Sequence, residues 1–147
     1  MKQIAFGLIV VITMFLALFT GPANAILLLN PAVSASTVGT TICVPGYTKT
    51  VRPSASYARG VKRRLLVKQG VPFGNIADYE LDHIIPLTLG GHPHSLDNLA
   101  LQKWDDALIK DRLEPRLNRL VCSNKLQLYD AQACIYTGWQ ACARRFP

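Results

Sequence analysis

The stretch "YELDHIIPLTLGGHPHSLDNLALQ", residues 79–102, sets an Asp-His pair, two more histidines, a Gly-Gly pair and an Asp-Asn pair among apolar residues. Polar and apolar side chains alternate over residues 79–85, which is typical of a β-strand, and Pro86 limits how far that strand continues. Gly90-Gly91 indicates a tight turn or open loop, and residues 96–101 indicate a second short extended segment. The stretch therefore predicts two short strands joined by a polar loop.

Helices are predicted on both sides of this stretch. Residues 102–122 carry apolar side chains at near-helical spacing, and Pro115 is expected to kink or restart that helix. A last helix is predicted over about residues 126–143. Upstream, Ser54 or Ser56 can cap a helix that ends near Gly70. The order of the elements predicts an α+β domain in which a hairpin is followed by a helix and flanked by further helices.

The first residues of the chain have the composition of an export signal. Lys2 precedes an apolar run that ends at Gly21-Pro22, and Ala23-Asn24-Ala25 forms a small-residue cleavage site, so residues 1–25 predict a signal peptide. A single membrane anchor is the alternative, and a second cleavage site after Ala35 stays open. We expect residues 26–42 to be a flexible lead-in and residues 43–147 to form the domain. The protein is then secreted or periplasmic, without stable membrane association after cleavage.

The chain is basic, with a formal net charge of +7 at pH 7. Removing residues 1–25 takes away only Lys2, so the exported part keeps about +6 (7 − 1). A basic exported domain favours an anionic partner such as nucleic acid, anionic lipid or acidic polysaccharide.

Four cysteines, Cys43, Cys122, Cys134 and Cys142, lie after the predicted signal. An even number in an exported domain favours disulfides, and zinc is the rival interpretation, although no C-x-x-C spacing is present. Three pairings are possible. In one straight helix Cys134 and Cys142 are about 12 Å apart, too far to bond, so they can pair only if Thr137-Gly138 breaks the helix.

"DHIIPLTLGG", followed by "DNLALQ" and a charged helix, resembles the HNH endonuclease family, the nucleases built on a ββα-metal hairpin. Fourteen residues lie between His83 and Asn98, a spacing similar to that of the family. "CVPGYTKTVRP", "KDRLE", "LVC" and "LYDAQ" with a following Trp are similar to small exported bacterial members. The resemblance covers roughly residues 43–139, and Asp-His-x-x-Pro with Gly-Gly and Asn-Leu in order is its most specific part.

The resemblance implies a role for three residues. His83 is the general base that takes a proton from the attacking water, since a neutral imidazole is available near its ordinary pKa of about 6.5. Asp82 is a ligand for a divalent cation, and Asn98 holds the loop by hydrogen bonds so that His83 faces the phosphate. The implied reaction is phosphodiester hydrolysis that leaves a 5′-phosphate and a 3′-hydroxyl.

The chain departs from the family in the helix after the hairpin. Family members often supply His or Asn where spacing assigns Ala107, whose side chain cannot ligate a metal. Asp111 follows one turn later on the same helical face, so Asp82 and Asp111 are the expected oxygen pair, with Asp106 in reserve. Two carboxylates without a helical histidine favour Mg²⁺, with Mn²⁺ or Ca²⁺ as alternatives, over zinc.

Basic residues surround the predicted site in the sequence. We expect them to follow a nucleic-acid backbone, chiefly DNA and also RNA, with little sequence specificity. Arg52 and the basic run at residues 62–64 belong to the same set of basic residues. The expected nucleic-acid contacts are Lys103, Lys110, Arg112 and Arg116.

Simpler interpretations stand beside these. His92 and His94 are favoured as plain loop residues over a metal or substrate role, and Lys110–Glu114 is most simply a surface ion pair at i,i+4. Two rival functions also remain: an HNH-like nucleic-acid-binding module that has lost turnover, suggested by Ala107, and a secreted structural or inhibitory protein.

Overall fold

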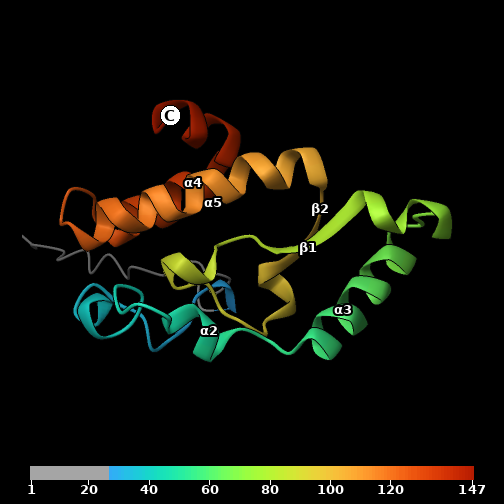
Figure 1. Cartoon of the computed structure of the whole chain (residues 1–147), viewed down its shortest axis with the longest axis horizontal. Coiled ribbons are helices and arrows are strands. Elements are labelled where there is room, and N and C mark those ends of the chain that lie inside the picture. Colours follow the sequence, from blue (N-terminus) through green and yellow to red (C-terminus); the bar gives the residue numbers. More distant parts are fainter. Residues whose placement is uncertain (1–26) are drawn as a thin grey trace, which may run out of the picture.

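The computed structural model describes residues 27–147, and its β-hairpin lies between two groups of helices (Figure 1). Strand β1 (Tyr79–His83) pairs antiparallel with β2 (Leu99–Lys103), as the alternation predicted. Helices α4 (Trp104–Cys122) and α5 (Leu128–Arg145) pack together on one side, and α3 (Ala55–Lys68) lies on the other. The protein is therefore an α+β structure. Short 3-10 segments are Val38–Thr40, Phe73–Asp78, Leu87–Leu89 and Leu96–Asn98.

The hydrophobic core lies where α4 and α5 meet the loop after β1. Leu89 and Leu117 are fully buried there, and Ile135 of α5 is 2% exposed. Burial of apolar side chains from three segments fixes the hairpin loop against the two long helices. Further members of the core are Ile85, Leu113, Val121, Leu128, Ala131 and Cys142.

Helix α3 begins where the sequence predicted. The hydroxyl of Ser54 accepts a hydrogen bond from the backbone N–H of Tyr57 at 3.2 Å, which caps the first turn. The helix ends at Lys68, two residues before Gly70, whose φ of +65° is left-handed.

Residues 43–53 contain a short helix, α2 (Tyr47–Val51). Gly46 opens it with a left-handed φ of 86°, which a residue with a side chain rarely adopts. Arg52 ends it in an extended conformation, as expected of a residue that precedes proline.

The segment expected to be a flexible lead-in is part of the folded unit, which corrects that prediction for residues 27–42. Leu28 and Val33 are each 8% exposed and Ile42 is 5% exposed, all within the core. Leu28 O also accepts a hydrogen bond from His92 N at 2.8 Å. Three apolar residues among small hydroxylated ones show no period, so their burial could not be predicted from the pattern of residues. The predicted signal peptide, residues 1–25, lies outside the described residues.

Helix α4 runs without a restart through Pro115, where a kink or new helix was expected. Pro115 is on the exposed side, whereas Leu113 and Leu117 are buried on the inner side. Packing of that inner face outweighs the one backbone hydrogen bond that the proline cannot donate. None of the helices within residues 27–147 has both the length and the apolar character needed to cross a bilayer.

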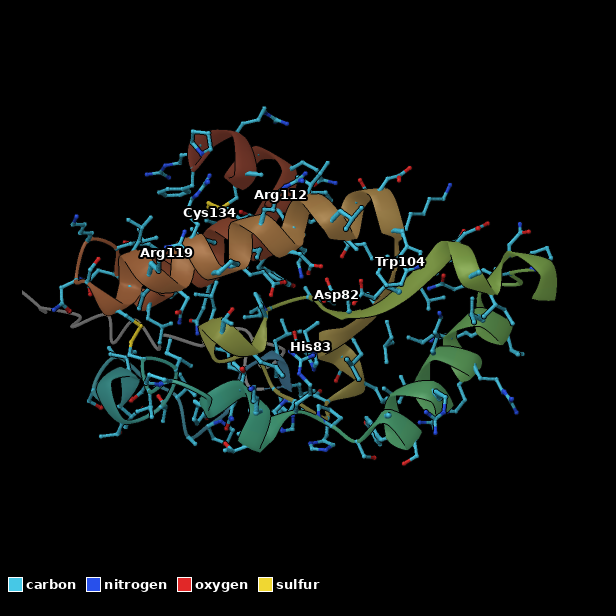
Figure 2. The ribbon with its side chains drawn as sticks, in the orientation of Figure 1. Asp82, His83, Trp104, Arg112, Arg119 and Cys134 are labelled. Carbon is cyan, nitrogen blue, oxygen red and sulfur yellow. A yellow bond between two sulfur atoms is a disulfide. The ribbon has the colours of Figure 1, made fainter. Side chains whose placement is uncertain are left out.

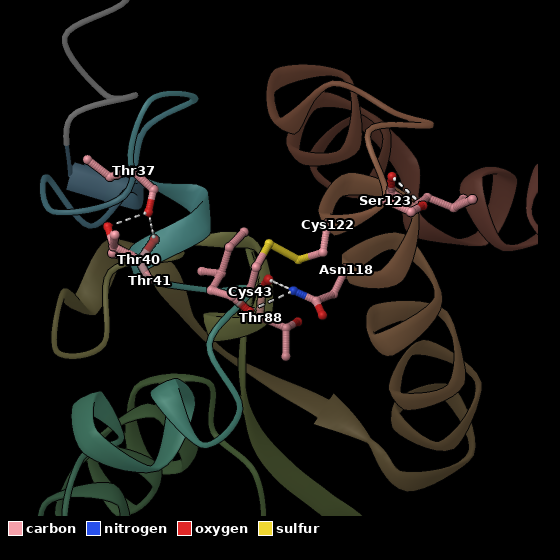
Figure 3. Close-up of a disulfide and its surroundings, with 10 residues drawn as sticks. Thr37, Thr40, Thr41, Cys43, Thr88, Asn118, Cys122 and Ser123 are labelled. Carbon is pink, nitrogen blue, oxygen red and sulfur yellow. Dashed lines mark hydrogen bonds between the residues drawn. A yellow bond between two sulfur atoms is a disulfide. The ribbon is translucent and has the colours of Figure 1, made fainter.

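Both cysteine pairs are disulfides. Cys43–Cys122 joins the segment before α2 to the end of α4 (Figure 3). Cys134–Cys142 closes within α5 with Cα atoms 5.4 Å apart, because non-helical backbone at Gly138 breaks the helix as that pairing required. Two disulfides indicate an oxidising location, extracellular or periplasmic.

Candidate active site

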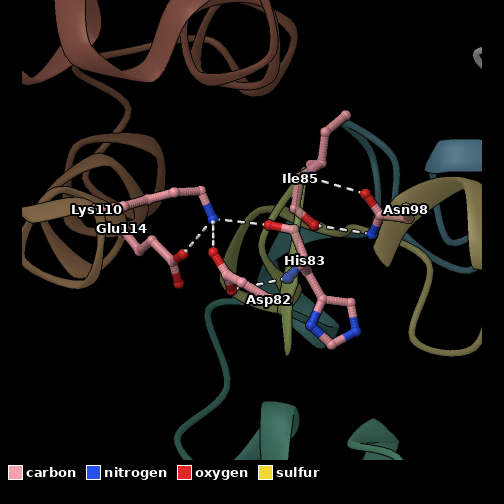
Figure 4. Close-up of polar contacts among 6 residues, drawn as sticks. All are labelled: Asp82, His83, Ile85, Asn98, Lys110 and Glu114. Carbon is pink, nitrogen blue, oxygen red and sulfur yellow. Dashed lines mark hydrogen bonds and ion pairs between the residues drawn. The ribbon is translucent and has the colours of Figure 1, made fainter. Parts of the chain in front are cut away.

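The hairpin positions Asp82 and His83 at the end of β1, opposite Ala100 and Leu99 of β2. As neighbours on a strand they point to opposite faces, so Asp82 turns toward α4 and the imidazole of His83 turns away from it (Figure 4). Oδ1 of Asp82 accepts a hydrogen bond from His83 N at 2.7 Å. The carboxylate thereby fixes the backbone that carries the imidazole.

Asn98 braces the loop between the strands and is fully buried. Its Oδ1 accepts from Ile85 N at 2.8 Å, and its Nδ2 donates to Ile85 O at 3.0 Å and to His92 O at 3.1 Å. Gly91 permits this approach, because a Cβ there would lie 1.7 Å from Ile85 O and 2.7 Å from Asn98 Nδ2. Asn98 is therefore a positioning residue, with no side-chain atom exposed to a substrate.

The hydrogen bond of His83 fixes its tautomer. Nε2 lies 3.1 Å from the carbonyl oxygen of Pro93, which can only accept, so Nε2 carries the proton and Nδ1 keeps a free lone pair. Burial lowers the pKa of His83 below its usual 6.5, and Arg52 lowers it further. The imidazole is thus neutral at neutral pH and can accept a proton at Nδ1.

Lys110 of α4 occupies the space between the helix and the hairpin. Its ammonium donates to Asp82 Oδ2 at 2.6 Å, to His83 O at 2.7 Å and to Glu114 Oε1 at 2.9 Å (Figure 4). The side chain of Lys110 is only 3% exposed. Burial disfavours the ammonium, but Glu114 and Asp82 outweigh it and raise the pKa of Lys110. Lys110 is therefore a buried internal cation, which corrects both expected roles, a surface ion pair and a phosphate contact.

A cavity of about 350 Å³, here called the His83 cavity, lies between the hairpin, α4 and the segment that joins α2 to α3. Burial raises the pKa of Asp111 and the charge of Asp82 raises it further. Burial raises the pKa of Glu114 to about 7. Several carboxyl groups thus share one small space, in which a bound cation would favour their ionised forms. Polar side chains that line it are His83, Glu80, Asp82, Asp111, Glu114 and Arg52.

The two expected metal ligands line the same cavity. Asp82 and Asp111 both face the His83 cavity, and each carboxylate keeps lone pairs beyond its present hydrogen bonds. Within residues 27–147 no three His, Cys, Asp or Glu side chains gather as a metal-holding group. Two carboxylates with several waters suit Mg²⁺, which rarely takes an all-protein cage. The donor set fits that ion. Ala107 is 1% exposed. Asp106, the reserve ligand, does not line the His83 cavity but lines a neighbouring one that Asp82 and His83 also line.

The arginines of α4 lie away from His83, contrary to expectation. Arg112 and Arg116 line a small separate cavity with Phe146, whose carbonyl oxygen accepts from Arg116 Nη1 at 2.7 Å. Figure 2 shows Arg112 on the side of α4 opposite Asp82 and His83. Arg112 and Arg116 are four residues apart and share one helical face, which is turned away from the hairpin, so proximity in sequence did not place them near the site. Lys103 remains exposed at the end of β2.

The loop histidines serve the loop itself. His92 Nδ1 accepts hydrogen bonds from the backbone N–H groups of His94 and Ser95, at 3.1 and 2.9 Å. The carbonyl oxygen of His94 accepts from Tyr57 Oη at 2.6 Å. Both agree with the interpretation of plain loop residues.

The sequence interpretation placed neither Arg52 nor Glu114 beside His83, although it counted Arg52 among the basic residues expected to follow a phosphate backbone. Arg52 is exposed at the His83 cavity, and its guanidinium forms no hydrogen bond or ion pair with residues 27–147. Glu114 holds the ammonium of Lys110 from the helix side. The Arg52-Pro53 pair predicted the end of an element. Nothing in the sequence indicated that Arg52 would lie beside His83.

No protein-family description, curated protein or solved structure matched this chain.

Proposed function

We propose that the protein is an exported, metal-dependent endonuclease of the HNH type, whose ββα-metal core consists of β1, β2 and α4. Its substrate is DNA, and RNA shares the phosphodiester that the site would cleave. The observation that carries the proposal is the hydrogen bond from His83 Nε2 to Pro93 O, which leaves Nδ1 free as a base beside an acidic cavity.

In this proposal His83 activates a water. The water oxygen attacks phosphorus while Nδ1 takes its proton, the bond between phosphorus and the 3′ oxygen breaks, and the leaving oxygen gains a proton from solvent. The products are a 5′-phosphate and a 3′-hydroxyl. Asn98 acts through the loop, because two of its hydrogen bonds hold Ile85, two residues after His83, and a third holds His92, the neighbour of Pro93, to which the imidazole donates.

Asp82 and Asp111 would hold the divalent cation in the His83 cavity. Bound there, Mg²⁺ would neutralise charge on the phosphate and on the leaving oxygen. Lys110 holds Asp82 in place, since its ammonium bonds Oδ2 of a carboxylate that also lines the cavity.

Arg52 supplies the positive charge for the substrate. An exposed guanidinium with no partner among the described residues, on the rim of the cavity that His83 lines, suits a phosphate oxygen. It replaces Arg112 and Arg116 as the arginine expected to contact the backbone near the reacting bond. Contacts to the phosphate backbone carry no sequence information, so little sequence specificity is expected.

A metal series on plasmid DNA tests the proposal. We expect cleavage with Mg²⁺ or Mn²⁺, none with a chelator, and a higher metal requirement in Asp111→Asn. Asp105→Asn is the matched control, because Asp105 is exposed in the first turn of the same helix and lines none of the cavities described above. Equal cleavage with and without chelator would contradict the proposed role of a divalent cation.

Lys110 also favours the second candidate, a nucleic-acid-binding module without turnover. The ammonium of Lys110 already occupies the side of Asp82 that faces α4. A metal bound between Asp82 and a ligand from α4 would compete with it for that side. That candidate predicts binding of DNA with no cleavage under any metal, and the same series separates the two.

A further inference from the structure

We propose that the cavity between β2 and α5 binds an unpaired nucleobase of the substrate, so that the protein prefers single-stranded over duplex nucleic acid. The proposal rests on the function proposed above, because it places a nucleotide next to the reacting phosphate. The site is a cavity of about 460 Å³, here called the aromatic cavity.

Three aromatic side chains line the aromatic cavity: Tyr79 from β1, and Tyr136 and Trp139 from α5. Tyr136 is 54% exposed, although it lies beside a hollow that could cover it. Every nucleobase has a flat π-face, so aromatic walls take a base with little regard to sequence. A base within a duplex is stacked and cannot enter such a hollow.

Polar groups in the same cavity match the edge of a base. Gln102 Nε2 is buried with no hydrogen-bond partner, and the amide offers both a donor and an acceptor. The cross-strand neighbour Glu80 does not satisfy this amide, and its side chain lines the His83 cavity instead. Lys103 adds a positive charge at the end of β2 for the phosphate that accompanies the base.

The position of the cavity links it to the reaction. Asp82 and His83 line both the aromatic cavity and the His83 cavity, because the end of β1 separates the two. A strand whose phosphate lies beside His83 can therefore place a neighbouring base between β2 and α5. A kink at Gly138 turns the second part of α5, so Tyr136 and Trp139 lie directly on either side of the break.

Binding of short oligonucleotides tests this without any need for cleavage. The quenching of tryptophan fluorescence would be titrated with a short thymidine oligonucleotide and with an abasic oligonucleotide of equal length and charge, in a chelator. We expect the abasic strand to bind at least about fivefold more weakly. Tyr136→Ala should weaken binding of the thymidine strand by a similar factor and leave abasic binding unchanged.

Tyr129→Ala is the matched control, because Tyr129 is 77% exposed on the same helix and lies outside the aromatic cavity. Equal affinity for the two strands, or equal effects of the two tyrosine substitutions, would overturn the proposal. Base-dependent binding without cleavage would support the base site and count against the nuclease, whereas cleavage with base-independent binding would do the reverse.

Discussion

The ammonium of Lys110 lies 2.6 Å from Oδ2 of Asp82, and so a helix residue and a strand residue form one buried ion pair beneath the candidate base. Glu114 adds a second carboxylate at 2.9 Å. The pair joins α4 to the end of β1, and it therefore connects the stability of the hairpin to the geometry of the site.

Replacing Lys110 tests that connection. Lys110→Met keeps most of the side-chain volume but leaves two carboxylates and a carbonyl without their shared donor. We expect a loss of about 3–5 kcal/mol in the free energy of unfolding, measured by urea denaturation. Lys125→Met, at an exposed lysine, should change it by less than about 0.5 kcal/mol. Similar small effects in both variants would contradict the buried network.

The brace at Asn98 gives a second prediction. Asn98→Ala removes three hydrogen bonds and leaves buried backbone groups of the loop unpaired, so we expect a loss of about 2–4 kcal/mol in unfolding free energy. Asn98→Asp keeps the acceptor for Ile85 N but turns a buried carboxylate oxygen toward Ile85 O and His92 O, so it should lose at least as much at neutral pH. Asn75→Ala, at an exposed position, is the control. The brace is refuted if Asn98→Ala melts at the temperature of this control.

The burial of Leu28 and Val33 predicts where the mature chain begins. Cleavage after Ala35 would remove Leu28 and Val33 from the core, whereas cleavage after Ala25 would retain both. Losing two buried aliphatic side chains should cost about 3 kcal/mol or more. We expect N-terminal sequencing of the exported protein to find residue 26 first, and a chain that starts at residue 36 to unfold at lower urea. Equal stability of the two chains would show that the segment adds nothing.

The lowered pKa of His83 predicts the pH dependence of cleavage. The base must be neutral, and burial favours the neutral form, so kcat/KM should fall on the acid side with a midpoint below 6.5. The positive charge of Arg52 adds to this effect, and Arg52→Ala should move the midpoint to higher pH; Arg59→Ala, exposed on α3, should not move it. An acid midpoint above 6.5 in the unmodified protein would exclude His83 in this environment as the base.

The sequence predicted the parts of the site that lie within one short segment. Alternation over residues 79–85 placed Asp82 and His83 on opposite faces of a strand, and the resemblance to HNH endonucleases implied that Asn98 braces the loop. These relationships are local, because strand periodicity and a tight loop determine them.

Relationships between segments could not be predicted in the same way. Helical spacing showed that Lys110 and Glu114 share a face, but not that this face presses against the hairpin. Arg52 reaches the site because the Cys43–Cys122 disulfide and the bonds from Asn118 Nδ2 to Ile42 O and Thr88 O hold the preceding segment in place (Figure 3). Such placement depends on tertiary packing, which a single sequence does not reveal.

The most direct test of the proposed chemistry compares two histidines in one assay. The measurement is the rate of plasmid nicking with Mg²⁺ by the unmodified protein, by His83→Ala and by His94→Ala, each checked for folding by its melting temperature. We predict that His83→Ala lowers the rate by about 10²–10⁴-fold, because it removes the general base, while His94→Ala stays close to the unmodified rate. Equal rates for the two variants, or no cleavage by the unmodified protein, would contradict the assignment of His83 as a catalytic base.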